Sequence, residues 1–292
     1  MLVLFTDTDN DVTPSMAKEL GYKGLISMPY SIGNKTIYPY VDFDESEYDY
    51  KEYYNMLRSG TIPSTSCLTP EEYKKYFEPE FAAGNDILYV HFSRKMTSTF
   101  DFMEIALNDL KQKYPERKFY EIDTKAITFA SLPIVFEVSR LYKEGKTIDE
   151  ILAWADVEVD KFATYMFVND LHFFKLSGRV KGIAAVMGSL IGIKPIIYMD
   201  PEGYMVSYGK ERGTQKALNK IWEYFEELGE DVEKYDIIVG HTDMEEWAQM
   251  LKDKLVEKYG DKVRIVTSCT NPTAGSKSGP DGVGITFHAI HR

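Results

Sequence analysis

Apolar and polar positions along the first half of the chain alternate in the rhythm of strands and helices. Apolar runs typical of buried strands occupy residues 2–5, 86–93 and 117–123. Residues 96–114 and 126–145 carry apolar positions at helical spacing and follow the second and third of these strands. Strands that alternate with helices predict an α/β domain built on a parallel sheet.

Cap and turn residues mark the boundaries of several elements. Gly33 and Asn34 separate two β-rich runs, which predicts a hairpin. Thr69 precedes a proline and two glutamates, a combination typical of a helix start. Thr147 with Glu150 is a capping-box signal and predicts that a further helix begins there.

The second half of the chain carries strand and helix signals in a different order. Residues 195–210 contain two strand-like runs about the turn sequence Pro-Glu-Gly, which predicts a hairpin. The pattern then predicts an amphipathic helix, a strand, a helix and a strand, at residues 214–229, 236–242, 244–260 and 263–268.

Length and composition fit two domains. With 292 residues, of which 44% are hydrophobic and 27% charged, the chain is long enough for one large or two ordinary domains and too apolar for disorder. We place the boundary near residue 163. Residues 1–163 are then expected to form an N-terminal α/β domain, and residues 164–292 a C-terminal domain of mixed α and β elements.

The charge balance and the cysteines argue against several classes of function. The chain carries 34 Lys and Arg against 46 Asp and Glu, a net charge of −12, so its average field repels nucleic acid and anionic lipid surfaces. Its first residues lack the basic and apolar regions of an export signal, which indicates a cytoplasmic protein. Cys67 and Cys269 lie far apart without metal-ligand spacing, so we expect neither a disulfide nor a metal site.

Residues 175–195 combine glycines and apolar residues between basic ones. The apolar part is shorter than the ~20 residues that cross a bilayer and is interrupted by glycine, so we expect no stable membrane insertion. No phosphate-binding glycine fingerprint occurs in the chain, and we expect no cofactor. The segment is expected to be a helix that either packs in the core or lines a tunnel for a slender apolar ligand with Ile183, Val186, Met187 and Leu190.

The acidic stretch TDTDNDVT after the first strand has two interpretations. Asp9, Asp11 and Thr13 are spaced like the catalytic residues of haloacid-dehalogenase-like phosphotransferases, which act with Mg²⁺. Alternatively, Asp7 accepts backbone N–H groups at the strand end, and the following acids cap the turn. The phosphotransferase would also need a downstream lysine and an acidic pair, of which residues 236–246 offer only a loose imitation.

Seven motifs resemble, in the same order along the chain, those of the DegV family. The stretch VNDLHFFKLSGRVKG resembles the family's Leu-x-x-Leu-x-x-Gly-Gly-Arg element, with Ser177 in place of the first glycine. The other six resemblances are TDTDNDV to Asp-Ser-Thr-Ser-Asp-Leu, PSTSCLTPEEY to Pro-x-Thr-Ser-Gln-Pro-Ser, FSRKMTSTF to Ser-Ser-x-Leu-Ser-Gly-Thr-Tyr, EIDT to Val-Asp-Ser, IGIKPIIYMDPEG with KERG to the downstream hairpin, and SKSGPDGVG to Thr-His-x-Gly-Pro-Gly.

The resemblance implies a fold and a function. It implies a two-domain α/β protein that encloses one long-chain fatty acid between its domains. The protein would have no catalysis of its own and would present the acid to a separate fatty acid kinase. Since the resemblance covers essentially the whole chain, we expect these properties of the whole protein.

The resemblance also implies where the head group of the ligand lies. It places the head between Thr65 with Ser66, Ser93 with Arg94, and the loop of Ser276, Lys277 and Gly279. Arg94 stands where the family pattern has a second serine, and Lys277 stands where it has histidine. Either these two cations bind a more strongly charged head group, or they point to solvent while Thr65 and Ser93 suffice.

Basic residues in two of the motifs correspond to surfaces that face the kinase in the family. The resemblance assigns this docking role to Arg179 and to the pair Lys210 and Arg212. The alternative for all three is ordinary surface salt bridging.

Overall fold

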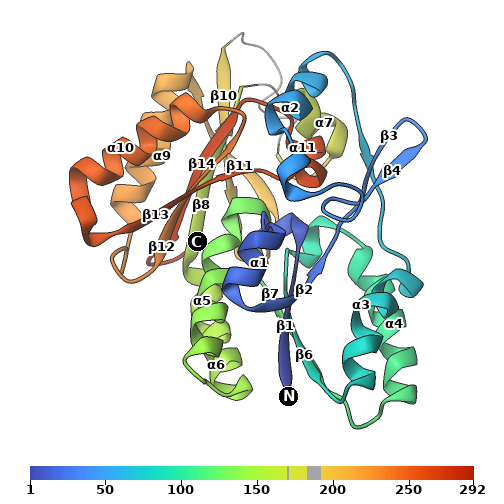
Figure 1. Cartoon of the computed structure of the whole chain (residues 1–292). Coiled ribbons are helices and arrows are strands. Elements are labelled where there is room, and N and C mark those ends of the chain that lie inside the picture. The colour runs from blue at the N-terminus through green and yellow to red at the C-terminus, as the bar shows by residue number, and fades with distance from the viewer. Residues whose placement is uncertain (170, 183–191) are drawn as a thin grey trace.

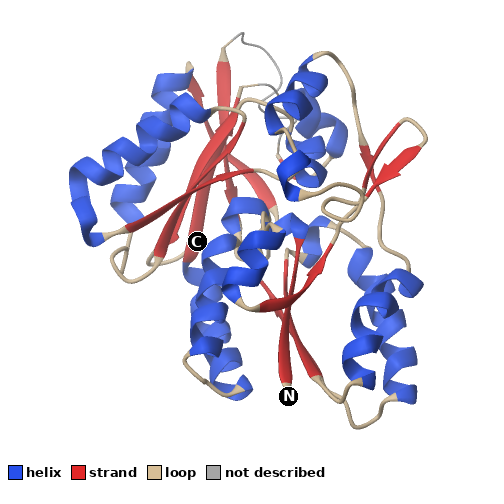
Figure 2. Cartoon of the chain, viewed as in Figure 1, coloured by secondary structure: helices blue, strands red, loops and turns tan. Residues whose placement is uncertain are grey.

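The computed structural model describes residues 1–169, 171–182 and 192–292, and its N-terminal part is built on a four-stranded sheet. The strand order is β2-β1-β6-β7, and all neighbouring strands run parallel. This arrangement confirms the prediction of a parallel α/β unit (Figures 1 and 2). The strands are β1 (Leu2–Asp7), β2 (Tyr22–Ile26), β6 (Asp86–His91) and β7 (Phe119–Asp123).

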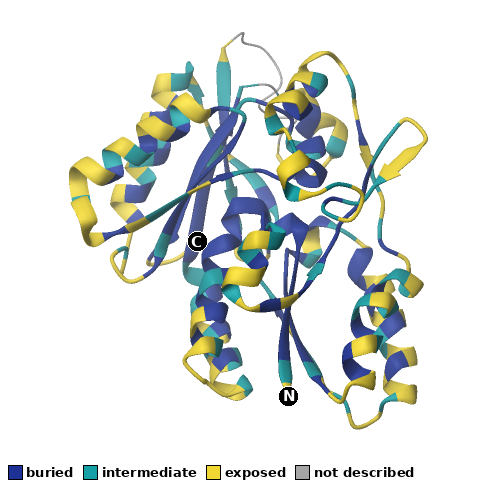
Figure 3. Cartoon of the chain, viewed as in Figure 1, coloured by how far each residue is buried: buried dark blue, intermediate teal, exposed yellow. Residues whose placement is uncertain are grey.

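Helices cover both faces of this sheet because successive side chains of each strand point to opposite sides. Val3 and Phe5 of β1 pack with α3 (Pro70–Ala82) and α4 (Thr99–Lys113). Leu4 packs on the other face with the remaining helices of this part of the chain, α1 (Pro14–Leu20), α5 (Leu132–Lys143) and α6 (Ile148–Glu158). The inner strands β1 and β6 are almost wholly buried, whereas the edge strand β7 is partly exposed and the outer sides of the helices are exposed (Figure 3).

The predicted helix starts at Thr69 and Thr147 are confirmed. The Oγ1 atom of each threonine accepts a hydrogen bond from the backbone N–H three residues later, at 3.3 Å in both cases. The glutamate at that position reaches back to the backbone N–H of the threonine, so both capping boxes are complete.

A second, mixed sheet occupies the C-terminal part of the chain. The described strands follow the order β13-β12-β14-β8-β10-β11-β9. Antiparallel pairs join β8 to β10 and to β14, whereas β12 and β13 run parallel. The helices α9 (Thr214–Leu228) and α10 (Glu245–Tyr259) pack on one face. The strands are β8 (Phe162–Val168), β9 (Val180–Lys181), β10 (Ile193–Met199), β11 (Met205–Arg212), β12 (Asp236–Thr242), β13 (Arg264–Cys269) and β14 (Gly282–His288).

A segment between β2 and α3 leaves the first sheet and reaches over C-terminal elements (Figure 1). It forms α2 (Tyr50–Arg58) and, with the residues before α3, a small antiparallel sheet of β3 (Tyr30–Ile32), β4 (Lys35–Ile37) and β5 (Ser64–Thr65). The helix α11 (Pro272–Ser278) packs against both α2 and α7 (His172–Ser177). Arg58 of α2 binds Asp243 at 2.5 Å and Asp281 at 2.6 Å, which ties this segment to the C-terminal sheet.

The helix predicted over residues 126–145 begins later than expected. Thr128 has a φ of 59°, a left-handed conformation that an α-helix does not accommodate. The residues around it form one of several short 3₁₀ helices, and α5 begins only at Leu132. These 3₁₀ helices are η1 (Thr8–Asn10), η2 (Glu45–Glu47), η3 (Arg94–Met96), η4 (Thr128–Ala130), η5 (Val159–Lys161) and η6 (Gly260–Lys262). None of the described helices combines the length and the apolar character that a bilayer crossing requires.

The two large sheets meet where η4 packs on the C-terminal sheet. Gly240 of β12 pairs with Gly284 of β14, so that two residues without side chains lie opposite each other. The ring of the buried Phe129 covers this pair: a Cβ added at Gly284 would lie 2.9 Å from the ring, and one at Gly240 would overlap it. The two glycines therefore make the close approach of η4 to the sheet sterically possible.

Replacing Gly240 with alanine is expected to destabilise the protein by about 1–3 kcal/mol, because the methyl group displaces a buried ring. Urea denaturation measures this change. The matched control is Gly209→Ala on β11, where an added Cβ would have no neighbour nearer than 4.0 Å. Equal stability of the two variants would show that the Phe129 contact does not hold the two sheets together.

Candidate functional site

A cavity lies between the two large sheets, at the carboxyl ends of the N-terminal strands. Its empty space is about 980 Å³, including the part that opens to solvent. The cavity is lined by side chains of β5, β8, β10, β11, α4, α7, α11, η1, η3, η4 and the end of β12, together with residues of the connecting segments. The cavity therefore exists only because both halves of the chain contribute walls.

One part of the cavity is apolar. Its wall combines side chains of the C-terminal sheet, α7 and α11 with side chains of η3, η4 and the segments that follow β2 and β6. Several of these are methionines, whose flexible side chains adapt to an apolar ligand. The apolar lining residues are Met28, Phe92, Met96, Ile127, Phe129, Ala130, Met166, Phe174, Ile197, Met199, Met205 and Ala274.

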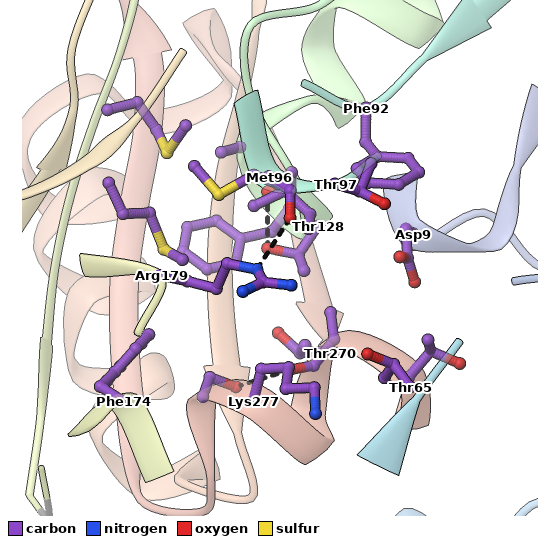
Figure 4. Close-up of a pocket in the computed structure, with 18 of the residues that line it drawn as sticks. Asp9, Thr65, Phe92, Met96, Thr97, Thr128, Phe174, Arg179, Thr270 and Lys277 are labelled. Atoms are coloured by element: carbon purple, nitrogen blue, oxygen red, sulfur yellow. Dashed lines mark hydrogen bonds between the residues drawn. The ribbon is translucent and has the colours of Figure 1, made fainter. Parts of the chain in front are cut away.

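Another part of the cavity is rich in hydroxyl groups and holds one acid. Figure 4 shows Asp9 and Thr65 at one end, Phe174 at the other, and Arg179 and Lys277 between them. The polar lining residues are Asp9, Thr65, Ser66, Thr97, Thr99, Thr128, Thr164, Arg179, Tyr198, Thr242, Thr270, Thr273, Lys277 and Ser278. Such a division suits an amphipathic ligand with a long tail and a polar head.

Two cations contribute to the cavity wall. The Arg179 guanidinium donates through Nε to the carbonyl of Met96, at 2.8 Å, and through a terminal nitrogen to the carbonyl of Ser177, at 3.0 Å. Lys277 has no hydrogen-bonding or ionic partner among the described residues. Burial, together with the charge of Arg179, lowers the pKa of Lys277. Lys277 is thus a cation that an anionic ligand would stabilise.

Three buried acids lie beside the polar end. Asp7 accepts hydrogen bonds from Tyr89 at 2.9 Å and from the backbone N–H of Phe92 at 3.3 Å. Asp11 accepts two hydrogen bonds from Asn271, each at 2.8 Å. Burial raises the pKa of both acids to about 7 despite these donors.

Asp9 differs from its two neighbours. It is 7% exposed, lines the cavity, and receives no side-chain hydrogen bond from any described residue. Burial raises the pKa of Asp9 well above its usual range, and the charges of Asp7 and Asp11 raise it further. Burial and the neighbouring charges therefore favour the neutral form of Asp9, and this acid lines the cavity.

The residues predicted to bind the head group fall into two groups. Thr65, Ser66 and Lys277 line the same cavity, and they come from β5, the following loop and α11. Ser276 and Gly279 do not line it: the hydroxyl of Ser276 donates to the carbonyl of Thr273, and Gly279 packs against Phe173 at the end of α11.

Ser93 and Arg94 were also predicted beside the head group, and the structure places them elsewhere. The hydroxyl of Ser93 is buried and donates to the carbonyl of Gly203 at 2.8 Å. Arg94 binds Glu104 at 2.8 Å and Glu121 at 2.6 Å. Two carboxylates thus hold the guanidinium outside the cavity, and the prediction of Arg94 as a head-group ligand needs this correction.

The predicted docking residues lie in two different places. Lys210 and Arg212 are exposed on β11. Arg179 belongs to the cavity wall. The predicted tunnel residues Ile183, Val186, Met187 and Leu190 lie outside the described residues; at the two ends of that segment, Gly182 and Gly192 have positive φ angles, so neither continues a helix.

The arrangement does not favour a phosphotransferase. The Oγ1 atom of Thr13 caps α1 by accepting from Met16, and one oxygen of Asp11 is held by Asn271. The described residues contain no group of three His, Cys, Asp or Glu side chains placed to hold a metal ion. The second interpretation of the acidic stretch, in which Asp7 accepts backbone N–H groups at the strand end, agrees with the observed hydrogen bond from Phe92.

Sequence reasoning missed several cavity residues. Thr128 and Phe129 were assigned to a helix, Met199 and Met205 were treated only as strand residues, and the strand that carries Met166, β8, was not predicted. Alternation along β8 and β10 places the apolar residues on two faces, but nothing in the sequence says which face is left open for a ligand. The packing of η4 on the second sheet decides this.

Comparisons with known proteins agree with the fold and the motifs. A family model described as that of uncharacterised DegV family proteins matches residues 1–289. A DegV domain-containing protein of Clostridium perfringens is 32% identical over 287 residues, which cover 98% of this chain and 96% of that protein. A DegV family protein of Thermus thermophilus, described by its fatty acid binding, has a TM-score of 0.86 at 21% identity over 99% of each chain. A stearic acid-binding protein of Eubacterium ventriosum has a TM-score of 0.85 at 20% identity, over 99% of this chain and 98% of that one.

The Asp9→Asn variant is expected to gain stability relative to the unsubstituted protein as pH rises from about 4 to about 8. An acid whose pKa is raised by folding binds its proton more tightly in the folded state, so it costs stability as pH rises above its unfolded pKa of about 4. Asparagine has the same shape and no such cost. Urea denaturation of ligand-stripped protein at pH 4.5, 6 and 8 measures the difference, which is expected to grow by on the order of 1 kcal/mol per pH unit. A constant difference would show that Asp9 is ionised in the folded protein.

Proposed function

Because the chain belongs to the DegV family, we propose that it is a non-catalytic carrier that encloses one long-chain fatty acid. The observation that carries this proposal is the division of one cavity into an apolar part and a part with hydroxyl groups, Lys277 and Arg179. The solved structures of family members described as fatty-acid-binding support it. The tail would lie along β8, β10 and β11, and the carboxyl group would lie near Thr65, Ser66 and Lys277.

The two parts of the ligand contribute differently to binding. Each buried CH₂ group contributes about 0.8 kcal/mol, so a long chain supplies on the order of ten kcal/mol before entropic costs. A buried carboxylate costs several kcal/mol unless donors match it. Lys277 and the hydroxyl groups supply such donors. The apolar wall would therefore set affinity, and the polar end would set orientation.

The proposal extends to a partner and a place in the cell. We propose that the carboxyl end is presented to a separate fatty acid kinase and that the exposed Lys210 and Arg212 on β11 take part in docking. Both proteins would then act in the cytoplasm. Arg179, which borders the cavity, would lie near the place where the kinase meets the ligand.

Freshly purified protein is expected to contain one fatty acid per chain. Native mass spectrometry would show the added mass, and solvent extraction would identify the acid. Protein that carries no lipid, and that also fails to take up palmitate, would contradict the carrier function.

Lys277→Met is expected to weaken fatty acid binding by about 10- to 100-fold, because a hydrogen bond to a charged group contributes roughly 1.5–3 kcal/mol. Titration with cis-parinarate, whose fluorescence rises in an apolar site, measures the affinity. Lys210→Met is the matched control, since it removes an exposed lysine outside the cavity and should leave this affinity unchanged. Equal affinities for the two variants would remove Lys277 from the head-group site.

A further inference from the structure

Asp9 is an unusual residue for the wall of a site that would hold an anion. A fatty acid head group carries a negative charge at neutral pH, and a second carboxylate beside it would repel it. Yet Asp9 is buried, faces the cavity and stands at the end that also holds Thr65 (Figure 4). The proposed function alone does not explain this acid.

We propose that the Asp9 carboxyl group and the fatty acid carboxyl group share one proton, so that the protein binds its ligand as a hydrogen-bonded acid–carboxylate pair. This inference rests on the proposed function, because it requires the fatty acid head to reach the polar end of the cavity. In the pair, neutral Asp9 donates its O–H hydrogen to one oxygen of the ligand carboxylate. Only this proton changes its position between the two carboxyl groups, and no other covalent bond forms or breaks.

The hydrogen bonds of the three buried acids support this assignment. Asp7 and Asp11 each have one oxygen that accepts at least two hydrogen bonds, and such donors favour the ionised form of an acid. Each of the three acids has one fully buried oxygen without a partner, but only Asp9 receives no hydrogen bond on its other oxygen from a described residue. Any proton shared among the three acids is therefore held most tightly by Asp9, which lines the cavity.

The remaining charges around Asp9 do not neutralise it. Asp7 and Asp11 flank it on its own segment, and Tyr89 of β6 lies close enough for its pKa to respond to Asp9. Across the cavity stand Lys277 of α11 and Arg179, and neither forms an ion pair with Asp9 in the described structure. Two cations that remain free of Asp9 are available to the second carboxyl group, that of the ligand.

Proton sharing gives the site a dependence on pH. Two carboxyl groups in hydrogen-bond contact cannot both be ionised, so the complex retains one proton at pH values where the free acids would lose it. Above the pKa of Asp9 in the ligand-free protein, binding requires uptake of a proton. The affinity is then expected to fall about tenfold for each unit of pH. A local rise in pH at the site would release the acid.

Calorimetric titration of the whole protein with palmitate tests the proposal. Titrations at several pH values between 7 and 9, each in two buffers with different enthalpies of ionisation, give the number of protons taken up per palmitate at each pH. We expect uptake that rises toward one proton as pH increases. Binding of palmitate without proton uptake across this range would overturn proton sharing and leave the carrier function intact. Failure to bind palmitate at any pH would overturn both.

Asp9→Asn supplies the matched variant. Asparagine keeps the shape and donates a hydrogen bond to a carboxylate, but it cannot exchange a proton. Once the pH dependence that Lys277 gives to both proteins is subtracted, the affinity of Asp9→Asn for cis-parinarate is expected to stay within about threefold between pH 6 and 9. The affinity of the unsubstituted protein is expected to fall about tenfold per pH unit at the alkaline end. The same slope in both proteins would assign the dependence to Lys277 and contradict the proposal. The same calorimetric titrations on Lys277→Met exclude protons taken up by Lys277, so uptake that persists in that variant is assigned to Asp9 even if Asp9→Asn does not fold.

Discussion

The contact of Phe129 with the glycine pair Gly240 and Gly284 fixes the relation between the two sheets. Because neither glycine has a side chain, η4 approaches the second sheet closely enough for Phe129 to be buried there. The same 3₁₀ helix contributes Thr128, Phe129 and Ala130 to the cavity wall. The width of the cavity therefore depends on a packing contact between residues that are more than 100 positions apart in the sequence.

The buried acids also help to position an element of the cavity wall. Asp11 holds Asn271, and Asn271 caps α11 by accepting from the backbone N–H of Ala274 at 3.0 Å. The hydroxyl of Thr273 donates to the carbonyl of Met28 at 2.7 Å, which adds a second hydrogen bond that holds the first turn of α11. The helix that carries Lys277 is thus positioned by the N-terminal sheet, although it belongs to the C-terminal part of the chain. The geometry of the polar end and the stability of the acid cluster are coupled for this reason.

The sequence was sufficient for the local elements and for the family, but not for the direction of side chains. Capping boxes at Thr69 and Thr147 and the parallel N-terminal sheet follow from local patterns and are confirmed. Thr65, Ser66 and Lys277 followed from motif resemblance. Arg94 was misplaced because its two partners, Glu104 and Glu121, lie on different elements, and only the fold brings them together. Asp9 was considered only as a nucleophile or a cap, since its exposure to the cavity depends on the second sheet.

The contrast between Arg94 and Lys277 shows how the fold separates structural cations from functional ones. Arg94 is neutralised by two carboxylates outside the cavity, so its charge is already satisfied. Lys277 is half-buried without a partner in the described structure, and burial works against its charge. An uncompensated cation and an uncompensated acid in one cavity, kept apart from each other, leave room for a group that complements both. A single carboxyl group does so, because one of its oxygens accepts from a neutral acid while the other faces a cation.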